Sequence, residues 1–278
     1  EALIEQDIKD GYHPFLIFAN GGTFTTGAVD DIEVITAIAK DKNLWVHLDA
    51  AYGGFFAMTE YGKKLFSGIE KCDSITLDPH KSLFLPYGTG ALVVQNGEYL
   101  RQAHEIEADF YGPIQDDFSK IDFCSYSTEQ TREWRGLRIW LPLMLHGIEP
   151  FRINLEEKLL LAQHAAQELT NIPGIELVFE PILSVFAFRL VLPGLSEEGL
   201  KQLNQDFLAR INNQKNVFLM TTTIKNKYCI RFCALSFRTH LDRVETGIEQ
   251  IRQAAHDLEK EFETTKTANT GQVHAHAE

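Results

Sequence analysis

The stretch that decides the fold reads Ser74-Ile75-Thr76-Leu77-Asp78-Pro79-His80-Lys81-Ser82-Leu83-Phe84-Leu85. It begins as a short apolar run, which predicts a buried strand, and then presents an acid, a proline, a histidine and a lysine together. About 30 residues upstream, Trp45-Val46-His47-Leu48-Asp49 ends another apolar run with a carboxylate. A charge at the end of a buried strand is costly unless it has a partner, so Lys81 and Asp49 are candidate site residues.

The first half of the chain alternates apolar runs with helical segments. The runs that predict strands are 14–20, 44–49, 74–77 and 88–94, and Asp30 or Asp31 is placed to cap a helix through about Lys42. This alternation predicts an α/β fold with a mainly parallel sheet. Ligands bind beyond the carboxyl ends of such strands, where Asn20, Asp49 and the segment 78–81 are expected to meet.

The second half has a different pattern. A long helix is predicted from the segment Arg132–Trp140 past Gly147 and Pro150 to Thr170, followed by strands over 175–179 and 185–190 and a hairpin over 217–233. We therefore expect a large domain over residues 1–150, a small α+β domain over 151–265 and a disordered tail over 266–278. The irregular stretch 105–133 has the composition of a loop that covers a site.

Composition excludes several classes of function. The chain has 278 residues, a net charge of −13 and a pI of about 5.2, which argues against nucleic acid or an anionic membrane as a partner. No apolar run is long enough to span a bilayer, and no signal peptide is evident at Glu1. Because the chain lacks an initiator Met and starts within a predicted helix, we expect a fragment. Four scattered cysteines favour a reducing cytoplasm and no disulfide framework or metal site.

The residue types at the strand ends point to a particular chemistry. A lysine amine that is sheltered from water forms a Schiff base with an aldehyde, and a buried carboxylate holds a proton on a pyridine nitrogen. Lys81 and Asp49 fit these two roles; the alternatives are a surface lysine in a turn and an ordinary buried ion pair. The loop 21–27, rich in glycine and threonine, offers donors to an anion. No Walker lysine and no Gly-x-Ser-x-Gly elbow is present, which argues against a nucleotide P-loop and a serine hydrolase.

Together, the motifs 49–52 (Asp-Ala-Ala-Tyr) and 78–81 (Asp-Pro-His-Lys) resemble the pyridoxal-phosphate-dependent group II amino acid decarboxylases, which include aromatic-L-amino-acid, glutamate, histidine and tyrosine decarboxylases. The resemblance continues through Gly22-Thr23, 135–140 and Arg231-Phe232 and covers about residues 11–255. It implies the aspartate-aminotransferase-like fold with part of the large domain and a C-terminal small domain. It also implies pyridoxal 5′-phosphate as cofactor, an amino acid as substrate, and a homodimer with the site at its interface.

The resemblance also implies roles for matched residues. Lys81 would form the Schiff base, Asp49 would pair with the pyridine nitrogen, and Ala51 would touch the ring. The residues expected near the phosphate or the Schiff base are His80, Asp78, where some members have Asn, and Thr23. The implied reaction releases CO2 and leaves the amine, with a lid tyrosine linked to protonation. That tyrosine aligns with Phe123 without a gap and with Tyr126 after a small shift, and we favour Tyr126.

Two other functions compete with the decarboxylase. One is a different enzyme that uses a lysine Schiff base with the same cofactor, such as an aldehyde synthase or an aminotransferase-like or desulfurase-like protein. The other is a non-catalytic remnant that only dimerises, because family members carry a further N-terminal region that supplies much of the substrate pocket.

Overall fold

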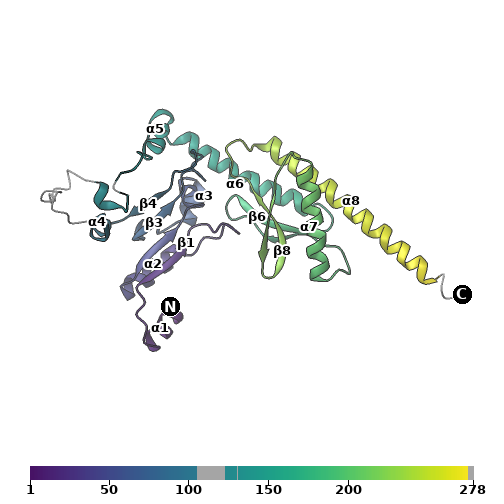
Figure 1. Ribbon diagram of the computed structural model, residues 1–278, viewed down its shortest axis with the longest axis horizontal. Helices are drawn as coiled ribbons and strands as arrows, with labels where there is room; N and C mark the ends of the chain where they lie inside the picture. Colours follow the sequence, from purple (N-terminus) through teal and green to yellow (C-terminus); the bar gives the residue numbers. More distant parts are fainter. Residues whose placement is uncertain (105–122, 130, 275–278) are drawn as a thin grey trace.

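The computed structural model describes residues 1–104, 123–129 and 131–274, with residues 268–274 described by their backbone alone. These residues form two four-stranded sheets, which Figure 1 shows on either side of the long helix α6. The elements of the first part are α1 (Ala2–Lys9), β1 (Leu16–Asn20), α2 (Ile32–Lys42), β2 (Trp45–Asp49), η1 (Gly54–Met58), α3 (Glu60–Leu65), η2 (Ile69–Lys71), β3 (Ser74–Leu77), β4 (Ala91–Val94), α4 (Glu98–His104), η3 (Phe123–Tyr126) and α5 (Leu137–His146). The second part consists of α6 (Glu149–Thr170), β5 (Ile175–Phe179), β6 (Val185–Leu190), α7 (Glu197–Asn213), β7 (Met220–Ile224), β8 (Lys227–Cys233) and α8 (Leu241–His274).

The first sheet has the order β1-β2-β3-β4, and its first three strands are parallel. The last strand, β4, pairs antiparallel with β3, so the sheet is mainly parallel, as the sequence predicts. The predicted cap of α2 is Asp31, whose carboxylate accepts a hydrogen bond from the backbone N–H of Val34.

Side chains alternate between the two faces of β2. Val46 and Leu48 are buried in a core that also contains Ile32 and Ala39 of α2. His47 and Asp49 therefore lie on the opposite face, and both are half-buried. The face that carries Asp49 is the one that the helix α2 leaves open.

The second sheet is antiparallel with the order β5-β6-β8-β7. Its hairpin turns at Lys225 and Asn226, which have φ angles of 48° and 63°, as a two-residue hairpin loop requires. The strand β6 is buried along its whole length, because the helices α6, α7 and α8 pack on it or beside it around one apolar core.

The helix α6 belongs to both cores. Leu155 and Leu159 pack in the first core, and the later residues Leu161 and Ala165 pack in the second. The predicted domain division at residue 150 falls in the first turn of this helix and stays a prediction.

Two helix boundaries differ from the sequence predictions. The predicted helix through Gly147 is broken there into α5 and α6, because Gly147 adopts φ 73° and ψ −179°, which no helix accommodates. At the other end, the backbone of α8 continues to His274, although the sequence predicts a structureless tail from Lys266. Extending an existing helix costs far less than starting one, so a polar segment can continue it without a core of its own.

Candidate cofactor site at the carboxyl edge of the first sheet

The turn after β3 holds Lys81 beside an acid. Its backbone N–H donates to the carbonyl oxygen of Asp78 at 2.8 Å, and the N–H of Leu85 donates to the carbonyl oxygen of Pro79 at 3.1 Å. The Lys81 Nζ lies 2.8 Å from the Asp78 Oδ2, while the side chains are 36% and 20% exposed, respectively. The lysine thus leaves the strand end already paired with a carboxylate.

His80 is fixed in the same turn. Its Nδ1 lies 2.7 Å from the carbonyl oxygen of Thr89, which can only accept a hydrogen bond, so Nδ1 carries the proton. The ring lies 4.8 Å from that of Tyr87, and its Nε2 lies 4.0 Å from the Asp78 Oδ2. The atom Nε2 therefore faces the same carboxylate that pairs with Lys81.

Asp49 ends β2 next to this turn. Its Oδ1 accepts a hydrogen bond from the N–H of Ala51 at 3.2 Å, and the carbonyl oxygen of Ala51 accepts one from the N–H of Asp78 at 3.2 Å. Within the sheet, Asp49 pairs in register with Asn20 on one side and Thr76 on the other. The structure therefore brings Asp49, Ala51 and the turn of Lys81 to one edge of the sheet.

The loop that carries Thr23 packs against the same edge. Gly22 has a φ of +103°, and a Cβ there would meet the Cα of Gly53 at 2.8 Å, so the two backbones touch. The Oγ1 of Thr23 lies 2.7 Å from the Oγ1 of Thr26 and accepts from the N–H of Ala28 at 3.2 Å. The Thr23 hydroxyl thus first stabilises its own loop.

His47 is a candidate residue that the sequence reasoning did not assign. Its Nδ1 lies 2.8 Å from the Ser74 Oγ, and its Nε2 lies 3.1 Å from the Thr76 Oγ1. Because His47 precedes Asp49 by two residues in a strand, the two side chains share a face. That spacing is the signal by which His47 could have been found.

The two candidates for the lid tyrosine lie in the short helix η3. Phe123 is 64% exposed and lies 5.8 Å from the Cζ of Arg132. Tyr126 lies near Gly97, where an added Cβ would be 3.7 Å from the tyrosine ring. Among the described residues, no hydrogen bond or ring contact joins either of them to Lys81. Residues 105–122 and 130 of the predicted covering loop 105–133 lie outside the described ranges.

Metal chemistry receives no support from the described side chains. No group of three or more histidine, cysteine, aspartate or glutamate side chains gathers in a metal-binding arrangement within the described ranges. Each of the four cysteines is a thiol rather than half of a disulfide.

Comparison with known proteins identifies the family of the chain. The profile of the pyridoxal-dependent decarboxylase conserved domain matches residues 1–191, more than half of the chain. The chain belongs to the pyridoxal-dependent decarboxylase family. It is 29% identical over 257 residues to an aromatic-L-amino-acid decarboxylase of Bacillus atrophaeus, covering 92% of this chain and 54% of the relative. It is 28% identical over 250 residues to tryptophan decarboxylase 2 of Oryza sativa subsp. japonica, covering 90% of this chain and 50% of the relative.

Solved structures of the family have the same fold. The crystal structure of Catharanthus roseus tryptophan decarboxylase in complex with L-tryptophan superposes with a TM-score of 0.84 at 26% identity, covering 92% of this chain and 54% of that one. The Oryza sativa structure with pyridoxal phosphate and tryptamine gives a TM-score of 0.85 at 21% identity and the same coverage, which supports the fold alone. The fold is thus the aspartate-aminotransferase-like one. The chain spans about half the length of the curated relatives it matches.

The residues present fit pyridoxal 5′-phosphate, the cofactor that this membership implies. An amine and a carboxylate stand at neighbouring strand ends, as a cofactor with an aldehyde and a ring nitrogen requires. The Oγ of Ser82, next to Lys81, is buried without a hydrogen-bond partner in the described part of the chain. Because buried hydroxyls are normally paired, this orphaned group fits a site that a polar ligand completes.

Proposed function

We propose that this chain carries the lysine-bearing part of an enzyme that decarboxylates an L-amino acid to the amine and CO2. The observation that carries the proposal is the pairing of Lys81 with Asp78 at the sheet edge that Asp49 also reaches, in a chain of the pyridoxal-dependent decarboxylase family. When bound, pyridoxal phosphate supplies an electron sink for the bonding pair that remains when CO2 leaves.

Four residues of the chain have separate roles at the cofactor. Lys81 would hold pyridoxal phosphate through its amine, and Asp49 would hold a proton at the pyridine nitrogen. Ala51 has no bulk beyond its methyl group, so a flat ring can lie against it. The Nδ1–H of His80 donates to the carbonyl oxygen of Thr89, so its Nε2 faces the Asp78 carboxylate that pairs with Lys81.

Two further residues would lie near the cofactor's phosphate. Thr23 offers its hydroxyl from the loop 21–27. Asp78 keeps Lys81 positioned but repels a phosphate, because like charges in one site raise each other's energy.

The first experiment locates the attachment point. Adding pyridoxal phosphate to the full-length protein should give an absorbance band at about 420 nm, and borohydride should fix the cofactor on Lys81. A Lys81→Ala variant should lose both signals, while Lys71→Ala, which removes an exposed lysine paired with Glu33, should keep them. Cofactor fixed by borohydride on another lysine would refute the assignment of Lys81 as the attachment point.

The second experiment identifies the reaction. Release of CO2 over a panel of L-amino acids, with the organic product identified by mass spectrometry, separates a decarboxylase from a transaminase or desulfurase. Cofactor attachment at Lys81 without turnover of any amino acid would favour the non-catalytic remnant.

We propose Tyr126 as the residue that returns the proton. A general acid contributes about 10²–10⁴ in rate, so Tyr126→Phe should lower amine formation by about that factor. Phe123→Tyr should change it little. If instead Phe123→Tyr raises the ratio of amine to aldehyde product, the lid position belongs to Phe123 and the protein is an aldehyde synthase.

We also propose a homodimer, supported by the apolar surface of α5. Trp140, Met144 and Leu145 are 55%, 65% and 69% exposed, and contiguous apolar patches of this kind mark interfaces. Replacing Met144 and Leu145 by Asp should halve the mass that light scattering measures. Leu160→Asp, at an equally exposed leucine of α6, serves as the control. An unchanged mass in the α5 variant would remove this support.

We propose the cytoplasm as the compartment, because the four cysteines are thiols. No helix within the described ranges is long and apolar enough to cross a bilayer. A fluorescent fusion that located the protein in an oxidising compartment would contradict this assignment.

A further inference from the structure

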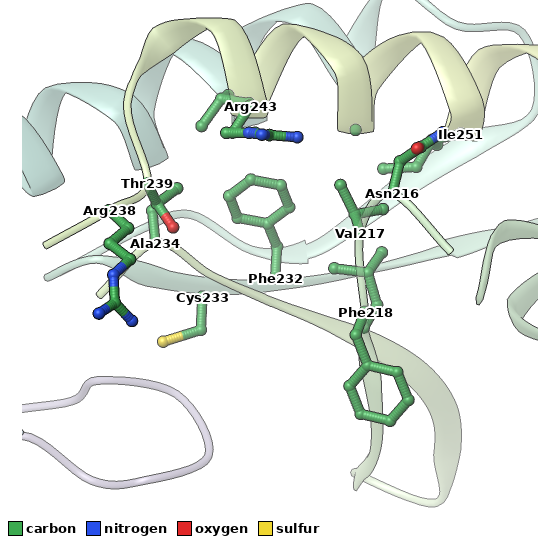
Figure 2. A pocket seen from close by; sticks show the side chains of 13 residues that line it. Asn216, Val217, Phe218, Phe232, Cys233, Ala234, Arg238, Thr239, Arg243 and Ile251 are labelled. Carbon is green, nitrogen blue, oxygen red and sulfur yellow. The ribbon is translucent and has the colours of Figure 1, made fainter. Parts of the chain in front are cut away.

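A cavity of about 320 Å³ lies between the end of β8 and the first turns of α8 (Figure 2). The guanidinium groups of Arg238 and Arg243 point to opposite sides of β8, so they do not converge on one ligand. The backbone N–H groups of Arg243 and Val244 already donate to the carbonyl oxygen of His240. Polar side chains that do converge lie on the open face of the first sheet.

A row of hydrogen-bonded side chains crosses β2 and β3 on that face. The indole Nε1 of Trp45 lies 2.8 Å from the Ser74 Oγ, and the same oxygen lies 2.8 Å from the Nδ1 of His47. The Nε2 of His47 lies 3.1 Å from the Thr76 Oγ1. Thr76 is the register partner of Asp49, so the row ends beside the carboxylate of the candidate cofactor site.

Aromatic rings pack against two members of this row. The ring of Phe18 lies 5.2 Å from that of His47, and the ring of Tyr99 meets Trp45 edge-on at 5.3 Å. The imidazole of His47 is thus bonded at both nitrogens and in contact with a neighbouring ring. It cannot turn without breaking two hydrogen bonds, so its orientation is fixed.

The direction of each hydrogen bond follows from the chemistry of the groups. An indole N–H can only donate, so the Ser74 oxygen accepts from Trp45. Ser74 is 6% exposed, and in the described part of the chain its hydroxyl has no other partner than Trp45 and His47. Because a buried hydroxyl proton is normally paired, Ser74 donates to the Nδ1 of His47. The Nε2 of His47 then carries the proton of a neutral imidazole.

The last group of the row is the hydroxyl of Thr76. Its oxygen accepts from the Nε2–H of His47, so its own proton is left for another acceptor. Neighbouring strands lie about 4.8 Å apart, which brings the register partner Asp49 within reach of that hydroxyl. The Oδ1 of Asp49 accepts from the Ala51 N–H, whereas its Oδ2 has no hydrogen-bond partner among the described residues.

We propose that His47 is a positioning residue of the cofactor site, which turns the hydroxyl proton of Thr76 toward the Asp49 carboxylate. A hydrogen bond to a carboxylate favours its charged form, and a charged Asp49 favours a proton on the pyridine nitrogen of a bound cofactor. This role rests on the proposed function. The tautomer of His47 does not, because it follows from the protein's own hydrogen bonds.

The first measurement is ¹⁵N NMR of the full-length protein without cofactor. The His47 signals, assigned by their loss in His47→Asn, should show a proton on Nε2 and none on Nδ1. Ser74→Ala removes the donor to Nδ1, so this preference should weaken. A proton on Nδ1 in the wild-type protein overturns the proposal, because Nε2 would then accept the Thr76 proton that the proposal assigns to Asp49.

The second measurement is an absorbance titration with pyridoxal phosphate. Thr76→Val removes the hydroxyl and keeps the shape, and His47→Asn keeps an amide at the position of Nδ1 but none at Nε2. Each should weaken binding about 3–10-fold, and the double variant should lose no more, because both break one chain of hydrogen bonds. His47→Gln, whose amide reaches the position of Nε2, and Thr76→Ser should bind within about twofold of the wild type. Thr223→Val, at an exposed threonine of β7, is the control and should change nothing.

A cofactor analogue with carbon in place of the ring nitrogen separates this role from a general structural effect. It has no ring nitrogen for Asp49 to face, so Thr76→Val and His47→Asn should not weaken its binding. Equal losses for the analogue and for pyridoxal phosphate overturn the proposal, as does binding to a folded His47→Gln variant that is as weak as to His47→Asn. Thermal melting shows which variants are folded.

The same titration distinguishes this inference from the proposed function. If the wild-type protein attaches the cofactor at Lys81 and both Thr76→Val and His47→Asn bind it equally well, the inference alone is wrong. If the wild-type protein attaches no cofactor, the proposed function is wrong, and the role of His47 at the cofactor falls with it.

Discussion

The Nε of Arg231 donates a hydrogen bond to the carbonyl oxygen of Phe24 at 3.0 Å, across 207 positions of sequence. The guanidinium also lies 4.4 Å above the Phe24 ring. One buried arginine of β8 thus holds the glycine-rich loop of the first sheet against the second half of the chain. The loop that carries Thr23 is thereby held in place by a residue of the second sheet.

Replacing Arg231 should loosen this loop. Arg231→Ala removes a charged hydrogen bond and a cation–π contact and should lower the free energy of unfolding by about 2–3 kcal/mol, as measured in urea. Arg231→Lys keeps the charge but not the planar group, so it should recover only part of the loss. Arg238→Ala, which removes a stack on an adjacent exposed ring, is the control and should cost about 0.5 kcal/mol or less. Equal losses of unfolding free energy in the two alanine variants would show that the contact of Arg231 with Phe24 does not stabilise the protein.

A second link joins the Asp-Ala-Ala-Tyr motif to Ser184, the residue that precedes the strand β6. The hydroxyl of Tyr52 lies 2.8 Å from the Ser184 Oγ and accepts from the Ser184 N–H at 3.1 Å. Because both residues are buried, Tyr52→Phe leaves the serine groups unpaired and should cost about 1–3 kcal/mol of unfolding free energy. Tyr61→Phe changes a tyrosine that is 44% exposed and should have almost no effect. If Tyr52→Phe leaves the unfolding free energy unchanged, the loss of the hydroxyl is compensated, for example by a water molecule that pairs with Ser184.

Lys158 should be among the most sensitive charged residues. Lys158→Met leaves the Thr239 carbonyl and part of the Glu157 carboxylate without a partner, which should cost about 2–4 kcal/mol. Lys201→Met breaks an exposed pair with Glu198 and should cost about 0.5 kcal/mol or less. Urea unfolding measures both, and similar values would contradict the buried role of Lys158.

The cluster of Glu157, Lys158 and His240 predicts that the protein loses stability in acid. Burial opposes the ionisation of Glu157, but hydrogen bonds from Lys158 and His240 outweigh it and hold the carboxyl pKa below its ordinary value of 4.5. Since the folded state then binds protons less readily than the unfolded state, stability from this pair is present above about pH 4.5 and falls as the pH drops through the folded pKa. The Glu157→Gln variant should lose less stability than the wild-type protein as the pH drops below about 4.5.

Asp78 offers a test of charge near the cofactor. Asp78→Asn keeps the shape, removes the charge that pairs with Lys81 and relieves repulsion of a phosphate, so pyridoxal phosphate should bind about 3–10-fold more tightly in an absorbance titration. Asp73→Asn, at an acid that accepts from the Val46 N–H, controls for a general change of charge. Weaker binding in Asp78→Asn would show that positioning Lys81 outweighs the repulsion.

The buried thiol of Cys72 predicts that the protein loses stability at alkaline pH. Burial raises the pKa of its thiol to about 11 from an ordinary 9.0, with Asp73 and Glu70 contributing. Above about pH 9 the unfolded thiol loses its proton while the folded one keeps it, so the unfolded state binds fewer protons and stability falls toward pH 11. Cys72→Ala should lose that pH dependence in thermal melts. In the native protein, alkylation of Cys72 at pH 8 should be about 100-fold slower than in urea, and equal rates would refute its shielding.

Much of the first sheet could be read from the sequence. Parallel strands end at one edge, so two apolar runs that finish in Asp49 and in the segment 78–81 had to bring these groups together, and their register does so. The hairpin before Cys233 and the cap at Asp31 are likewise local, because each depends on a few adjacent residues.

Other features depend on distant partners. Gly147 ends one helix and separates it from the next, although the surrounding composition favours helix throughout. The pairs of Arg231 with Phe24, Tyr52 with Ser184 and Lys158 with Thr239 join residues between 81 and 207 positions apart. No local pattern encodes such contacts, since they exist only once the two sheets pack beside α6.

The sequence by itself therefore determined the strand ends, and with them the place of Lys81 and Asp49 and the family. Only the tertiary structure decided which distant residues hold the loop of Thr23 and the ring of Tyr52 in place. The physical reason is range: strand and turn preferences act over a few residues, whereas buried polar pairs and cavities arise from the way whole layers pack.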